Sequence, residues 1–190
     1  MKKSVPLLLV LLISLGCGPS IKTKRLAIEP AAARGQIAIT IKPAEGIEAT
    51  DVSRMRYLLQ ESFAAAGYGK VSVNSGGNPS SRTVKILLTR FEHDSSSNNT
   101  KMATGIGCAY ICFIAAPCLL LPGFNEPRFE ITADVSAVDN GRILFEKVMS
   151  ETAKASANAF DRGNDELKKN LEVLAAHNFT AAILKQLDRK

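Results

Sequence analysis

The clearest fold signal in the sequence lies between Phe129 and Glu151, where the chain reads FEITADVSAVDNGRILFEKVMSE. Apolar and polar residues alternate from Phe129 to Ala137, which is typical of a strand with one face in the core and the other in water. Asn140-Gly141 then supplies the two positive-φ residues of a tight type I′ turn. The stretch therefore predicts a β-hairpin whose second strand covers residues 143–151.

Two amphipathic helices are expected outside this hairpin. The first follows Asp51, which has the position of an N-cap, and ends near Gly67, where a left-handed residue is favoured. Its apolar residues have helical spacing: Val52, Met55, Leu59, Phe63 and Ala66. The second runs from Asp165 to Leu187 with Asn164 as its cap. Its apolar stripe recurs every four residues: Leu167, Leu171, Ala175, Phe179, Ile183 and Leu187.

Three further strands are expected before the hairpin, over residues 37–41, 70–74 and 83–91, because apolar residues alternate there or lie between turn signals. The order is strand, helix, strand, strand, an apolar interruption, strand, strand, helix. Two helices over one sheet bury both apolar faces. The sequence therefore predicts an α+β fold, with a mostly antiparallel sheet of about five strands and two amphipathic helices.

The N-terminus has the pattern of an export signal. Lys2 and Lys3 form a positive head, residues 7–15 are apolar except for Ser14, and Gly16 precedes Cys17. The apolar run is too short for a transmembrane helix, which needs about 20 apolar residues.

The four residues Ser14-Leu15-Gly16-Cys17 resemble the lipobox of bacterial lipoprotein precursors. The resemblance implies that the Cys17 thiol receives diacylglycerol, that the chain is cut before it, and that the new N-terminus gains another acyl chain. It also implies an envelope location, in the outer membrane and facing the periplasm, because Gly18 is not the aspartate that marks inner-membrane retention. Two or more acyl chains give stable membrane attachment.

The expected organisation is a signal peptide over residues 1–16, a lipidated tether over 17–35, and one α+β domain over 36–190. Removing the signal lowers the formal charge from +6 to +4, which together with export argues against a nucleic-acid partner. The tether holds four basic residues and only Glu29, so it is either a solvated linker or a segment that favours anionic headgroups.

The most unusual part of the domain is an apolar insertion over residues 102–125, which contains no Asp, Glu, Lys or Arg. Three interpretations remain open: a loop over the domain's own core, a hairpin or short helix that enters the membrane or contacts a partner, and a true membrane span. A partner could be another protein or a second copy of the chain. The residues expected to make membrane or partner contact are Ile106, Tyr110, Ile111, Phe113, Ile114, Leu119, Leu120 and Leu121.

The insertion also carries Cys108, Cys112 and Cys118, for which an oxidising envelope permits a disulfide. Spacing does not settle which of them would pair. A metal site is not expected, because no fourth ligand stands at motif spacing and the two histidines are distant. His177, within the last helix, is expected at the surface or at the boundary of the core.

The sequence carries no recognised catalytic motif, so we expect neither an enzyme nor a cofactor. Its element order, anchor and insertion are loosely similar to small α/β envelope lipoproteins, including the curli-secretion pore and lipopolysaccharide-assembly lipoproteins. In the pore family, apolar hairpins enter the outer membrane on oligomerisation. The resemblance implies the same behaviour for residues 102–124. The expected function is a membrane-anchored accessory in envelope assembly, secretion or transport. The alternative is a lipoprotein that binds a ligand or host molecule.

Overall fold

The computed structural model describes residues 19–28, 34–73, 82–97, 125–157 and 164–189. Its elements are β1 (Ser20–Ile21), β2 (Gln36–Pro43), α2 (Ala49–Ala65), β3 (Lys70–Val73), β4 (Arg82–Ser97), β5 (Asn125–Asp139), β6 (Arg142–Ser156) and α4 (Asp165–Leu187). The strands form one sheet in the order β1-β6-β5-β4-β2-β3. The predicted α+β class is confirmed, although the described residues form six strands and not about five.

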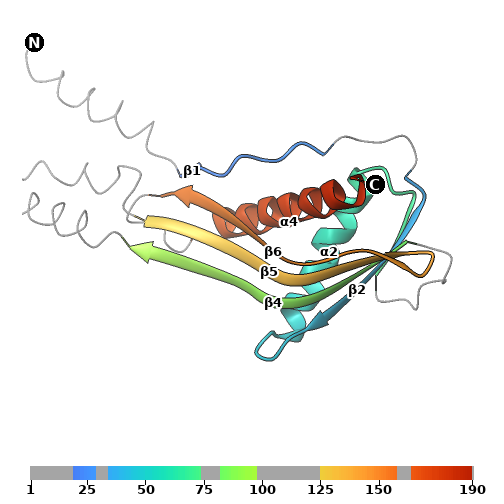
Figure 1. Ribbon diagram of the computed structural model, residues 1–190. Helices are drawn as coiled ribbons and strands as arrows, with labels where there is room; N and C mark the ends of the chain where they lie inside the picture. The colour runs from blue at the N-terminus through green and yellow to red at the C-terminus, as the bar shows by residue number, and fades with distance from the viewer. Residues whose placement is uncertain (1–18, 29–33, 74–81, 98–124, 158–163, 190) are drawn as a thin grey trace, which may run out of the picture. The chain divides into compact units, whose positions relative to one another are not determined.

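The sheet is mixed. β2 runs parallel to both of its neighbours, with Ile39 opposite Val73 on β3 and opposite Val84 on β4. β2, α2 and β3 therefore form a β-α-β unit, because parallel neighbours need a crossover connection. β4 and β5 run in opposite directions (Figure 1), and β1 pairs antiparallel with β6.

The hairpin is confirmed. Asn140 and Gly141 have φ angles of 50° and 80° and connect β5 to β6, as a type I′ turn requires. The alternating apolar side chains of β5, from Phe129 to Ala137, are all buried. Both strands are longer than expected, because β5 begins at Asn125 and β6 continues to Ser156.

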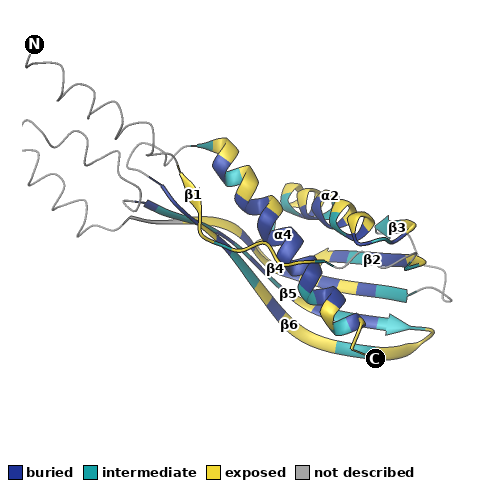
Figure 2. Cartoon of the chain, turned by 90° about the horizontal axis from the view of Figure 1, so that it is seen from above, coloured by how far each residue is buried: buried dark blue, intermediate teal, exposed yellow. Residues whose placement is uncertain are grey.

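Helix α4 has the predicted bounds and cap. Asn164 accepts a hydrogen bond from the Leu167 backbone N–H at 3.0 Å, which satisfies one donor of the first turn. The whole predicted stripe, from Leu167 to Leu187, is buried. Figure 2 shows that burial is almost continuous along the middle of this helix.

Helix α2 differs from the prediction at its start. Its N-cap is Glu48, so Asp51 lies in the first turn, where a carboxylate still suits the helix dipole. The predicted core residues of α2 are buried. At the other end Gly67 has a φ of +94°, the left-handed conformation expected there.

The chain divides into two compact units, which we describe separately. Within the described residues, the first contains 19–24, 93–97, 125–128, 153–157 and 164–171. The second contains 25–28, 34–73, 82–92, 129–152 and 172–189. In the second unit α2 and α4 lie on one face of the sheet (Figure 1).

Candidate functional site

The residues that the sequence singled out lie outside the described part of the chain. They are the lipidation site Cys17, the three cysteines of the insertion, and all eight residues expected to contact a membrane or partner. The described residues on either side of the insertion nevertheless constrain it, because β4 ends at Ser97 and β5 begins at Asn125.

In the first unit, the strands that flank the insertion are joined by side-chain contacts. Arg128 on β5 donates a hydrogen bond from Nε to the Asp94 carboxylate on β4 at 2.9 Å. β4 and β5 are neighbours in the sheet. The three interpretations of residues 102–125 concern residues outside the described ranges.

The described start of the expected tether belongs to the same unit. Ser20 pairs with Ser156 on β6, and Lys22 forms an ion pair of 2.8 Å with Glu126 on β5. Asn125 and Ala157 exchange two backbone hydrogen bonds of 3.2 and 3.0 Å. The N-terminal segment, the end of β6 and the start of β5 are thus hydrogen-bonded to one another in this unit.

In the second unit, residues 25–28 of the N-terminal segment lie against helix α4. The Leu26 backbone N–H donates to the Asn178 side chain at 2.9 Å. His177 Nε2 lies 2.9 Å from the Leu26 carbonyl oxygen, and Arg25 Nη2 lies 3.3 Å from Nδ1. Nε2 therefore carries the proton and Nδ1 accepts from the guanidinium.

His177 is only 8% exposed, so of the two positions expected for it the surface one is wrong. Burial lowers its pKa; the hydrogen bond with the Leu26 carbonyl raises the pKa, and the Arg25 charge lowers it further. One feature of the sequence indicated that His177 is buried: residues 173–184 contain no charged side chain. A helix that is uncharged all round is buried on more than one face.

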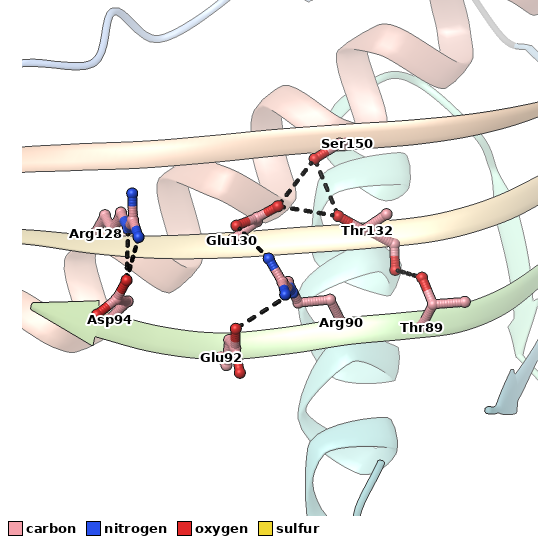
Figure 3. Close-up of polar contacts among 8 residues, drawn as sticks. All are labelled: Thr89, Arg90, Glu92, Asp94, Arg128, Glu130, Thr132 and Ser150. Carbon is pink, nitrogen blue, oxygen red and sulfur yellow. Dashed lines mark hydrogen bonds and ion pairs between the residues drawn. The ribbon is translucent and has the colours of Figure 1, made fainter. Parts of the chain in front are cut away.

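The other face of the sheet in this unit carries polar side chains and is called the open face; its residues include Lys85, Leu87, Arg90, Glu130, Thr132, Asp134, Ser136 and Ser150. Figure 3 shows a polar network on it. Arg90 contacts Glu92 at 3.2 Å and Glu130 at 3.1 Å. Thr132 lies 3.0 Å from the Ser150 hydroxyl and donates to Glu130 at 3.3 Å.

The alternation of β4 shifts by one residue beside this network. Buried side chains alternate from Val84 to Leu88 and resume at Phe91, so Thr89 and Arg90 are both exposed. A β-bulge produces this pattern, and bulges redirect side chains on a sheet. The shift places Arg90 among the carboxylates of the open face.

A hollow of about 410 Å³ lies on the same face. It is lined by two cationic, two anionic and two hydroxyl side chains, namely Lys42, Lys85, Asp134, Glu146, Thr40 and Ser136. Leu87 also lines it and is 40% exposed. This site could not be predicted from the sequence, because polar residues on the outer side of strands look like ordinary solvated positions.

A second hollow, of about 430 Å³, adjoins residues 26–28 and α4. Glu151 lines it, and burial raises the pKa of this carboxyl. Within the described ranges, His, Cys, Asp and Glu side chains form no group that could hold a metal ion. No described helix is both long and apolar enough to cross a membrane.

No protein-family model and no curated protein sequence matches the chain. Solved structures do. A Xanthomonas campestris protein of the DUF330 family aligns with 90% of this chain and 96% of its own, at 8% identity and a TM-score of 0.50.

A minor lipoprotein of Acinetobacter baumannii aligns with 78% of this chain and 88% of its own, at 10% identity and a TM-score of 0.44. A PelC dodecamer of Paraburkholderia phytofirmans, a point variant, aligns with 90% of this chain and 99% of its own, at 14% identity and a TM-score of 0.41. Others are also named lipoproteins. At these identities the likeness concerns the fold.

Proposed function

We propose that this protein is a lipid-anchored, non-enzymatic accessory lipoprotein of the bacterial envelope that acts in assembly, secretion or transport. In this proposal Cys17 carries the lipid, and residues 102–125 leave the sheet and return to it while contacting the membrane or a partner.

One observation carries the proposal. The N-terminal segment pairs with β6 at Ser20, and Lys22 contacts Glu126 at the start of β5, where the insertion ends. Cys17 precedes Ser20 by three residues, and three residues of chain reach at most about 10 Å. In this proposal the lipid on Cys17 and the apolar insertion therefore lie close together. An apolar segment beside a lipid anchor is positioned to meet the same bilayer.

Replacing Cys17 by serine tests the anchor. We expect C17S to move from the membrane fraction to the soluble fraction and to lose the mass of its acyl chains, because Ser lacks the thiol that is acylated. The matched control is C118S, which removes a cysteine of the insertion and should stay membrane-bound. Wild-type protein whose N-terminal peptide is unmodified, with residues 1–16 attached, would contradict the proposal.

Deleting residues 104–122 tests the insertion. The remaining residues, 98–103 and 123–124, are enough for an ordinary loop between neighbouring strands. We expect the variant to fold with the circular-dichroism spectrum and melting temperature of the wild type, but to lose a partner or a membrane contact. The readouts are complex size in detergent and protection of the folded protein from protease by vesicles.

A control for lost apolar surface is the pair Tyr57→Ser and Val173→Ser, since these side chains are 61% and 42% exposed on the helices. These substitutions should leave complex size and vesicle protection unchanged. Unfolding of the deletion variant would instead favour the alternative function, in which the insertion covers the core of a ligand-binding lipoprotein.

A further inference from the structure

The charged side chains of the open face fall into two groups, those with an ion-pair partner and those without one among the described residues. On this face Arg90 of β4 pairs with Glu130 of β5 across the sheet at 3.1 Å. Lys85 and Asp134 lie on the same two strands. Neither side chain makes a hydrogen bond or ion pair with any described residue, although both line the hollow.

The same holds for the other two charges of the hollow. Lys42 on β2 and Glu146 on β6 also have no ion-pair partner in the part of the chain that the structure describes. Because the sheet order is β6-β5-β4-β2, the two lysines lie on the β2–β4 side of the hollow. The two carboxylates lie on the β5–β6 side. A single exposed charge says little about binding. Here, however, the positive charges lie on one side of the hollow and the negative charges on the other.

We propose that the open face binds the open face of a second copy of this chain. A twofold axis parallel to the strands, between β4 and β5 and midway between the copies, places the β2–β4 side of each over the β5–β6 side of the other. Lys42 and Lys85 of each copy then meet Asp134 and Glu146 of its partner. A twofold interface must be self-complementary in this way, and stacked sheets with aligned strands are a standard packing.

The apolar and hydroxyl groups of the open face are also suited to contact with a second copy of this chain. Leu87 lies among the four charges and would be buried at the centre of the interface, where apolar side chains are enriched. Thr40 and Ser136 can exchange hydrogen bonds across it. This inference goes beyond the proposed function and does not depend on residues 102–125.

Charge reversal in pairs tests the interface, using full-length lipidated protein in detergent and analytical ultracentrifugation. The variant K42E/K85E makes all four charges negative, and D134K/E146K makes them all positive. Each should self-associate at least about tenfold more weakly than wild type, because like charges placed together in an interface are strongly unfavourable. An equimolar mixture of the two should regain wild-type association.

Wild-type association should also weaken in 1 M salt, where the screening length is about 3 Å. The substituted side chains are exposed, so both variants should keep the wild-type melting temperature, and recovery in the mixture shows that both are folded. A monomeric wild type would overturn the proposal. Unchanged self-association of the two variants, or a mixture that fails to recover, would do the same.

Discussion

Replacing Phe179 by alanine should lower the free energy of unfolding by about 3–5 kcal/mol. Phe179 is fully buried in the middle of α4, so truncation removes the whole phenyl ring from the core and leaves a cavity. Typical domains have a total stability of about 5–15 kcal/mol, so this single change removes a large part of it. Chemical denaturation followed by circular dichroism measures the loss.

The matched control is Val173→Ala on the same helix. Val173 is 42% exposed, and substitutions at such surface positions change stability by about 0.5 kcal/mol or less. If the two variants unfold at the same denaturant concentration, then α4 does not hold the core in the way described.

Lowering the pH from about 7.5 to about 5.5 should release residues 25–28 from α4 and lower the melting temperature, because this range crosses the ordinary pKa of histidine. Burial holds the folded-state pKa of His177 below its usual value, so the unfolded chain binds more protons. Stability is therefore full above about pH 6.5 and declines as pH falls toward the folded pKa. Protonation also converts Nδ1 from an acceptor into a donor that faces the Arg25 guanidinium.

A glutamine at position 177 provides the control for this pH effect. H177Q should lose it, since the amide can still donate to the Leu26 carbonyl but does not titrate. Burial raises the pKa of Glu151 and acts in the opposite direction, so the informative quantity is the difference between variants. Hydrogen exchange at Leu26, whose N–H binds Asn178, reports the release directly. Equal pH profiles for H177Q and wild type would refute the assignment.

The N-terminal segment shows why charge pattern alone can mislead. Residues 17–35 look like a basic tether in the sequence, yet Lys22 pairs with Glu126, and Arg34 pairs with Asp188 at 2.8 Å. These partners lie more than 100 residues away in the chain. A basic residue opposite a distant carboxylate cannot be distinguished in sequence from a solvated one.

The elements whose signals are local could be predicted from the sequence. The Asn140-Gly141 turn, the alternation of β5, the Asn164 cap and the α4 stripe depend on residues within a few positions of one another. The periods of strand and helix therefore make them visible. The bounds of α4 followed from such signals.

The neighbours of each strand could be learned from the tertiary structure alone. There β2 lies parallel between β3 and β4, β1 pairs with the edge of β6, His177 is buried, and Arg128 joins β5 to Asp94 on β4. Which strands become neighbours depends on the entropy lost when long loops close and on the apolar surface that distant segments bury against each other. Such a balance leaves no periodic trace in the chain.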